Sequence, residues 1–169
     1  METNQTPYQQ DQKPVEYAGF WWRFLAILID SIVISFVSWI FILPVLAIFG
    51  ISLFSLKESG FDMDDPKLFV GPFILAIVTM TFISTIIKWL YFSIMESSRH
   101  QGTVGKIILK IKVTDTSGNR VSFARATGRY FGKILSGMIL LIGYIMAGFT
   151  ERKQALHDIL AGCYVIKEN

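Results

Sequence analysis

Two charged residues interrupt the first long apolar stretch of this 169-residue sequence, and they are the first candidates for chemistry. Arg23 and Asp30 are seven positions apart, so at about 100° per residue they share one helix face, roughly 10 Å apart. Arginine can extend its guanidinium group to a membrane surface, whereas the aspartate side chain is too short. A carboxylate near mid-bilayer costs on the order of 2.5–3.5 kcal/mol, so Asp30 should face protein or a water-filled cavity.

Asp30 therefore has two interpretations. A carboxyl group in a low-dielectric site can take up and release a proton near neutral pH, which would let Asp30 exchange a proton for a cation. Alternatively, Asp30 only holds helices together, since polar contacts between membrane helices contribute about 0.6–2 kcal/mol. The sequence leaves both interpretations open.

The elements that position these residues are membrane helices. Hydrophobic residues make up 52% of the chain and the mean hydropathy is +0.48. The apolar residues form long runs, and two of these runs exceed the ~20 residues that cross ~30 Å of hydrocarbon. We predict an all-α membrane protein with spans at about 20–43 and 73–95, and a third apolar segment at 134–149. The third segment either spans the bilayer or is a re-entrant, bent segment.

Charge asymmetry predicts the orientation of the chain. The connection at 57–67 is acidic, whereas the connection at 99–133 carries eight Lys and Arg residues. The positive-inside rule places the basic insert, 97–133, in the cytoplasm and predicts a multi-pass membrane protein with a cytoplasmic N-terminus. Basic residues at both ends of the third segment favour a chain that returns, which would put both termini in the cytoplasm. Residues 1–16 are rich in Gln and Pro, so we expect a disordered tail.

The second span supplies further charged candidates. Thr81, Ser84, Thr85 and Lys88 recur at helical spacing on one face, and Glu96 follows near the cytoplasmic end. Lys88 lies at a depth similar to that of Asp30, so the two side chains could pair. Alternatively, Lys88 extends its ammonium group to the interface.

The basic insert has its own local pattern. Apolar and polar residues alternate at 109–114, a turn follows at 117–119, and 120–123 resembles a returning strand, so we predict a β-hairpin with a basic face. Residues 124–135 form an amphipathic pattern that predicts an interfacial helix along the membrane surface. Residues 154–162 predict a short helix, and 163–166 a third strand for the hairpin.

Enzyme chemistry is not indicated. The two histidines, His100 and His157, have no nucleophile or metal-ligand spacing around them, and Cys163 is the single cysteine. The acidic run at 62–65 lacks the glycine and terminal glutamate of a calcium-binding EF-hand loop. We therefore expect no cofactor, no nucleic-acid partner and no fixed metal ion, apart from a transient cation at Asp30.

Several stretches resemble the RDD family of small prokaryotic membrane proteins. They are Arg23, Asp30, the segments at 102–106 and 125–130, and the closing Leu-His-Asp-Ile-Leu-Ala-Gly at 156–162. The resemblance covers about 18–167, nearly all of the expected membrane domain at 17–167. The family is named for an arginine and two aspartates, which the resemblance places at Arg23, Asp30 and Asp158. The chain departs from the family pattern at Val104, where proline is common, and at Cys163, where threonine is usual.

The resemblance implies little about function. Transport of ligands has been suggested for the family, and some members are described as sodium–proton antiporters. The first hypothesis is therefore a transporter that exchanges Na⁺, K⁺, Li⁺ or H⁺ through Asp30. Three short segments cannot enclose a pathway, so this hypothesis requires a homo-oligomer in the lipid bilayer. The alternative is a non-transporting scaffold or accessory protein whose basic hairpin binds anionic lipid or a partner protein.

Arg23 and Asp158 should form a salt bridge at the cytoplasmic end of the bundle. A partly buried arginine prefers a carboxylate that accepts two parallel hydrogen bonds. If these two residues do not pair, Asp30 or Glu96 becomes the expected partner of Arg23.

Overall fold

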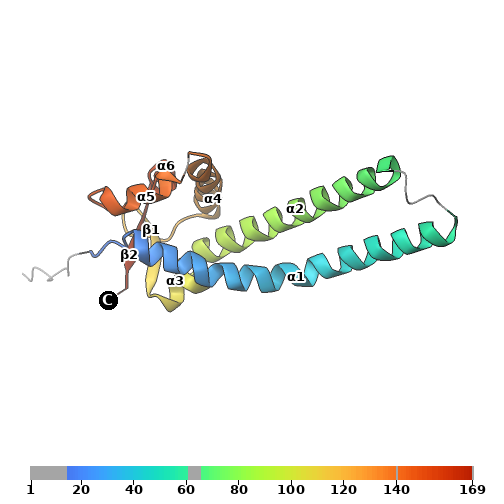
Figure 1. The fold of residues 1–169 in the computed structure, drawn as a ribbon. Coiled ribbons are helices and arrows are strands. Elements are labelled where there is room, and N and C mark those ends of the chain that lie inside the picture. The colour runs from blue at the N-terminus through green and yellow to red at the C-terminus, as the bar shows by residue number, and fades with distance from the viewer. Residues whose placement is uncertain (1–14, 61–65, 140, 169) are drawn as a thin grey trace, which may run out of the picture.

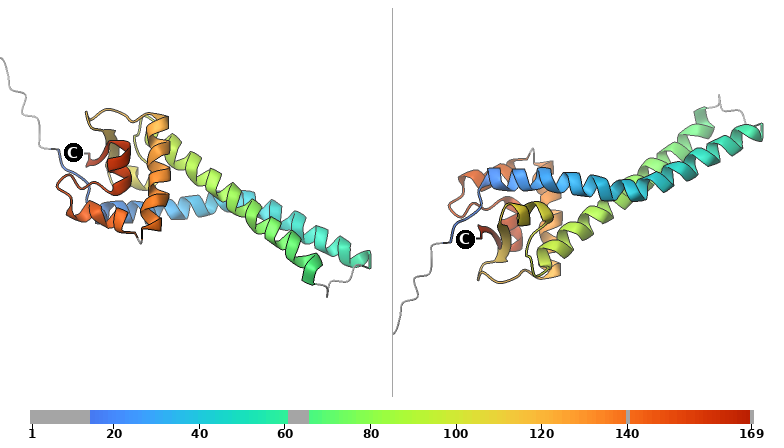
Figure 2. Two further views of the ribbon diagram at one scale, coloured as in Figure 1. Left: turned by 90° about the horizontal axis from the view of Figure 1, so that it is seen from above. Right: turned by 90° about the horizontal axis from the view of Figure 1, so that it is seen from below.

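A computed structural model describes residues 15–60, 66–139 and 141–168 of the chain. Two long helices, α1 (Phe20–Glu58) and α2 (Pro66–Ser97), lie side by side (Figure 1). The shorter elements are α3 (Val104–Ile108), β1 (Ile111–Asp115), α4 (Phe123–Met138), α5 (Ile142–Phe149), α6 (Leu156–Ala161) and β2 (Cys163–Lys167). They gather at the end where α1 begins and α2 ends, and we call the described residues from 98 to 168 the head (Figures 1 and 2).

The predicted fold class, an all-α membrane protein, is confirmed. Both α1 and α2 are long and apolar enough to cross a membrane. The second span was predicted at 73–95, and α2 extends it at both ends. The predicted tail lies largely outside the described residues, because the structure describes the chain only from residue 15, and the acidic run at 62–65 lies entirely outside them.

Helix α1 is longer than predicted. The sequence suggested an end near Leu43, but the helix contains Pro44 and continues to Glu58. A proline removes one backbone donor without ending a helix when residues on both sides remain helical, and here the apolar run continues beyond it. At 1.5 Å per residue, the 39 residues of α1 extend about 58 Å, nearly twice the ~30 Å hydrocarbon thickness of a bilayer.

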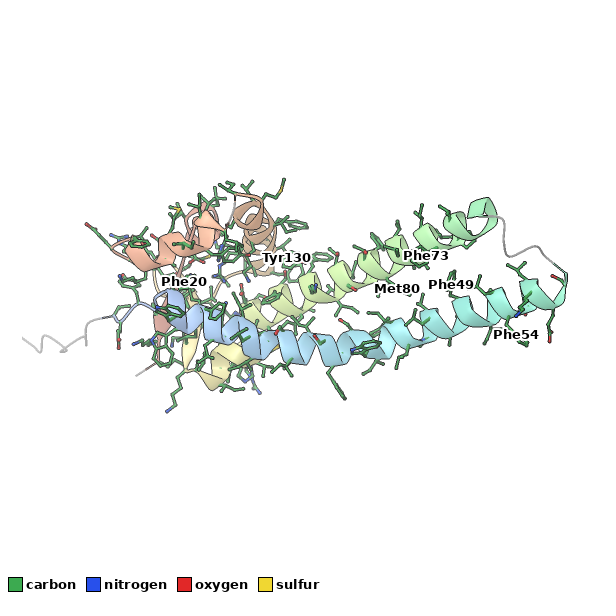
Figure 3. All side chains as sticks on the ribbon, viewed as in Figure 1. Phe20, Phe49, Phe54, Phe73, Met80 and Tyr130 are labelled. Carbon is green, nitrogen blue, oxygen red and sulfur yellow. The ribbon has the colours of Figure 1, made fainter. Side chains whose placement is uncertain are left out.

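The head covers only the first half of α1. The buried residues of this helix form one stripe at intervals of three or four, namely Arg23, Ala26, Asp30, Ile34 and Ser38. Beyond Ser38 the helix buries no residue in the described structure. Figure 3 shows Phe49, Phe54, Phe73 and Met80 on the part of α1 and α2 that extends away from the head, and Phe20 and Tyr130 at the head. The parts of α1 and α2 beyond the head therefore expose apolar side chains that a bilayer would cover.

The third apolar segment is bent. Helices α4 and α5 meet at an angle of 103°, and Leu141 at the start of α5 has a left-handed φ of 63°. Of the two alternatives for 134–149, the structure has the bent segment rather than one straight span. Helix α4 lies across the long axis of the α1–α2 helix pair, and α5 lies beside the first turns of α1 (Figure 2).

The two described ends of the chain meet in the head. Strands β1 and β2 pair antiparallel with Val113 opposite Val165, and Tyr17 forms a bridge with Ile166. Ala18 also donates from its backbone to Val165 O at 2.8 Å. If α1 and α2 each cross the bilayer once, residues 15–19 and the head lie on one side of it.

The predicted hairpin between 109–114 and 120–123 is wrong. Only an isolated bridge joins Thr114 to Arg120, because Ser122 caps α4 by accepting a hydrogen bond from the backbone of Arg125. Ser122 and Phe123 therefore begin a helix where the second strand was expected. The C-terminal strand, expected as a third strand, is instead the partner of β1.

Candidate functional site

Asp30 is buried against the start of α3, with 1% of its surface exposed. It accepts hydrogen bonds from the Thr103 hydroxyl at 2.5 Å, the Tyr91 hydroxyl at 2.8 Å and the Gly105 backbone N–H at 2.8 Å. The first N–H groups of a helix have no partner within the helix, and a carboxylate is stabilised there. Asp30 of α1 thus caps α3 from a different helix. Within the described residues it has no cationic partner.

The predicted pairing of Asp30 with Lys88 is not formed. Lys88 is exposed on α2, and Tyr91 is the α2 residue that contacts Asp30. Tyr91 comes three positions after Lys88 on roughly the same side of α2, and the Tyr91 hydroxyl is the group that reaches Asp30. The alternative interpretation of Lys88, an ammonium group at the membrane interface, stays a prediction.

Gly105 allows α3 to touch α1. A Cβ atom at this position would lie 2.2 Å from the backbone oxygen of Ala26 and 3.0 Å from its carbonyl carbon. Because these are backbone atoms, no side-chain rotation could relieve the overlap. The close approach brings the next residue, Lys106, into the interior of the head, where 6% of its surface is exposed.

Glu96 at the end of α2 is fully buried and holds three cations. Its Oε1 accepts from Lys106 Nζ at 2.7 Å and from Lys133 Nζ at 3.2 Å, and its Oε2 accepts from Arg129 Nη1 at 2.5 Å. The sequence identified Glu96 as a charged candidate of the second span and as an alternative partner for Arg23. In the structure it joins α2, α3 and α4 through charge-assisted hydrogen bonds.

Asp158 forms the second centre of the network. The predicted salt bridge with Arg23 is confirmed, and Arg129 also donates to Asp158 Oδ1 from Nε at 3.0 Å and Nη2 at 2.5 Å. Arg23 additionally donates to the backbone oxygens of Ala18 at 2.8 Å and Lys153 at 2.6 Å. Burial alone would raise the pKa of Asp158, but Arg129 and Arg23 hold it well below its ordinary value.

Helix α4 turns Arg129 and Lys133 inward, whereas Arg125 is exposed. Arg129 is 1% exposed, whereas Phe131, Ile134 and Leu135 are 54%, 46% and 44% exposed. Amphipathicity identified two faces of this helix but not which face meets the protein. The sequence signal for the network was the spacing of Arg129 and Lys133, one turn apart on a single face.

His157 on α6 is a neutral packing residue. Burial is the main cause that lowers its pKa to about 3. Its ring lies 5.2 Å from that of Tyr144, and its Cβ would be 3.0 Å from a Cβ built at Gly132. His157 therefore joins α6 to α4 and α5.

These elements enclose a cavity of about 410 Å³. Its polar wall consists of Arg23, Asp30, Lys106, Arg129, Lys133 and His157. We call this space the charged cavity, because four cations and one carboxylate line it. Glu96 and Asp158 bind these cations but do not line the cavity themselves.

The two lysines on this wall retain hydrogen-bonding capacity. An ammonium group has three donors, and within the described residues Lys106 and Lys133 each donate one hydrogen bond, both to Glu96 Oε1. Burial lowers the pKa of Lys106 to about 7; Glu96 opposes this shift, and the positive charges of Arg129 and Lys133 add to it. An anion in the charged cavity would favour the protonated form of Lys106.

Comparisons with known proteins place the chain in a family. The model of the RDD family matches residues 17–162. The chain is 38% identical over 154 residues to the uncharacterized protein YxaI of Bacillus subtilis (strain 168), a match that covers 88% of this chain and 96% of YxaI. It is 31% identical over 159 residues to the uncharacterized membrane protein YteJ of the same organism, which covers 90% of this chain and 82% of YteJ. No solved structure matches. The chain therefore belongs to the RDD family.

Proposed function

We propose that this protein is a membrane-anchored binding protein, without enzymatic activity, whose head holds an anion in the charged cavity. The observation that carries the proposal is the imbalance of charge on the cavity wall. Four cations line the space against three carboxylates: Asp30 already accepts three hydrogen bonds, and Glu96 and Asp158 bind the cations from outside the lining. A volume of about 410 Å³ is within the ~300–1,000 Å³ range typical of small-molecule sites.

Electrostatics favour an anion over a cation at this position. A cation in the cavity would face four lining cations, whose charge Glu96 and Asp158 offset only in part, in a low-dielectric interior. An anion would meet the spare donors of Lys106 and Lys133. Both lysines share one oxygen of Glu96, so an added anion would also relieve their mutual repulsion.

The length of α1 supports a location of the head at one membrane surface. The 39 residues of α1 extend about 58 Å, nearly twice the ~30 Å hydrocarbon core, so the helix can cross the bilayer and still hold the head against one membrane surface, with the apolar first turns of α1 in contact with lipid. The positive-inside rule places the basic head in the cytoplasm of a prokaryotic cell. In this arrangement Asp30 lies towards the cytoplasmic side rather than at mid-membrane.

Anion binding should stabilise the folded head. We expect sulfate to raise the thermal melting temperature of the purified protein in an uncharged detergent, relative to chloride at equal ionic strength, because ligands that bind only the folded state stabilise it. In the Lys133→Gln variant the shift should fall to less than half of its parent value.

Lys112→Gln is the matched control for that experiment. Lys112 lies on β1, away from the cavity lining, in an exposed ion pair with Glu168 at 3.5 Å. This variant has the same change of charge and should keep the full sulfate shift. Equal shifts in both variants would mean that sulfate acts on the surface charge and not in the charged cavity.

Cation–proton exchange through Asp30 is the second candidate function. The observation that favours it is that Asp30 is buried, lines the cavity and is held by neutral donors within the described residues. A buried carboxylate that is not paired with a fixed cation is a candidate binding site for a transported cation. This function would require a homo-oligomer that completes a pathway through the bilayer.

Flux measurements in liposomes test this candidate. If Asp30 is the exchange site, Asp30→Asn should abolish coupled movement of Na⁺, K⁺ or Li⁺ with H⁺ while the protein still folds. The asparagine oxygen can keep the bonds from Tyr91 and Gly105, and the amide can donate to Thr103. Absence of flux in the parent protein, or parental flux in the variant, would remove Asp30 exchange as a function.

A further inference from the structure

The wall of the charged cavity includes cationic side chains, here called the cationic end, and apolar side chains that are open to the surroundings, here called the apolar end. The cationic end is formed by side chains such as Lys106 and Arg129, which are 6% and 1% exposed. Other lining residues are apolar and open to the surroundings: Phe24, Ile27 and Ile145 are 44%, 42% and 45% exposed. The cavity wall therefore combines cationic and apolar groups.

The apolar end lies between the first turns of α1 and helix α5. These two helices are in contact, and Figure 2 shows them side by side at one face of the head. The surrounding surface remains apolar, since Met138 is 76% and Phe149 is 85% exposed. An exposed apolar surface of this kind in a membrane protein is suited to contact with acyl chains.

A small inorganic anion would use only part of this space. Sulfate or phosphate could accept from Lys106 and Lys133, but it would leave the apolar wall of a 410 Å³ cavity without a partner. A ligand that joins an anionic group to a hydrocarbon chain would match both ends. A zwitterionic lipid would bring a cation towards the same positive wall, which disfavours it.

From this geometry we propose that the charged cavity binds a phospholipid of net negative charge. Its phosphate lies against Lys106 and Lys133, and an acyl chain leaves past Phe24, Ile27 and Ile145 into the bilayer. This inference rests on the proposed function, because it specifies which class of anion the head holds. In this proposal the head binds anionic lipid at the membrane surface. The binding groups are the buried lysines of the charged cavity and not basic residues on the outer surface of the head.

Native mass spectrometry of the full-length protein released from detergent micelles tests the inference. The probes are dioleoyl phosphatidylglycerol and dioleoyl phosphatidylcholine, which have the same chains and differ in net charge. We expect one phosphatidylglycerol retained per protomer, with at least tenfold preference over phosphatidylcholine. Lys133→Gln should reduce this retention at least fivefold, and Lys112→Gln should leave it unchanged.

A second variant separates the two ends of the cavity. Ile145→Gln changes an exposed residue of the apolar end, so the fold should survive. It should weaken retention of phosphatidylglycerol but leave the sulfate shift in melting temperature intact. Equal effects of this variant on lipid and sulfate would overturn the assignment of the apolar end.

The lipid inference and the proposed function can fail separately. Equal retention of the two lipids, or equal loss in Lys133→Gln and Lys112→Gln, would overturn the lipid inference. If sulfate stabilises the protein while phosphatidylglycerol is not retained, the head binds an anion but not this lipid. If neither binds, the proposed function fails together with the inference.

Discussion

Glu96→Gln should strongly destabilise the head of this protein. The substitution removes the charge that holds Lys106, Arg129 and Lys133 together and leaves three cations close to one another in a buried site. Removal of one partner from a buried ion pair costs about 3–5 kcal/mol, and here one carboxylate serves three partners. We expect a melting temperature at least 10 °C below that of the parent, since about 1 kcal/mol shifts the melting temperature of a chain of this size by roughly 2–4 °C.

Two comparison variants define this result. Glu168→Gln removes an exposed carboxylate that is 3.5 Å from Lys112, and it should change stability by less than about 1 kcal/mol. The double variant Glu96→Gln with Lys106→Met should recover part of the loss, because it removes one of the unpaired cations. If Glu96→Gln melts at the parental temperature, the ion network does not hold the head together.

Gly105→Ala should separate α3 from α1. The new Cβ would meet the backbone oxygen of Ala26 at 2.2 Å, and a backbone atom cannot move aside without a shift of the whole helix. Overpacking usually costs about 1–3 kcal/mol, and this site should exceed that range because the hydrogen bonds to Asp30 would also be lost. The loss would appear as a lower melting temperature and as faster proteolysis around residues 99–110.

Gly128→Ala is the matched control. Gly128 lies in α4 and a Cβ there would have nothing within 4 Å, so alanine should be neutral or should stabilise the helix by up to about 1 kcal/mol. If both glycine variants melt at the parental temperature, α3 does not dock on α1 at the distance described.

The membrane helices were predictable because their signal is local. Long apolar runs identify α1 and α2 whatever the rest of the chain does. The end of α1 was not predictable in the same way, since Pro44 can end a helix, bend it or lie within it. The surroundings of the proline decide between these outcomes.

The contacts of the head depend on partners distant in the sequence. The salt bridge between Arg23 and Asp158 was predicted from the resemblance to the family and from the expected return of the chain. Arg129 was missed, although it contacts both Glu96 and Asp158. Periodicity shows that a helix has a basic face, but it does not show whether that face meets water or two buried carboxylates.

The strand pairing failed for a related reason. A turn between two alternating segments predicts a hairpin, because neighbouring strands usually pair. Here Ser122 starts α4 immediately after the turn, and β1 pairs with Cys163–Lys167 at the end of the chain. A local pattern identified the strands but could not choose between partners.

Calorimetric titration of the purified protein with sulfate tests the central claim, that the charged cavity binds an anion through Lys106 and Lys133. Titrations at pH 7.5 in two buffers of different ionisation enthalpy also measure the protons taken up on binding. We predict one sulfate per protomer with fractional proton uptake, because burial holds the pKa of Lys106 at about 7 and an anion would raise it. Binding should be lost in Lys133→Gln and kept in Lys112→Gln. No binding by the parent, or the same affinity in both variants, would contradict the claim.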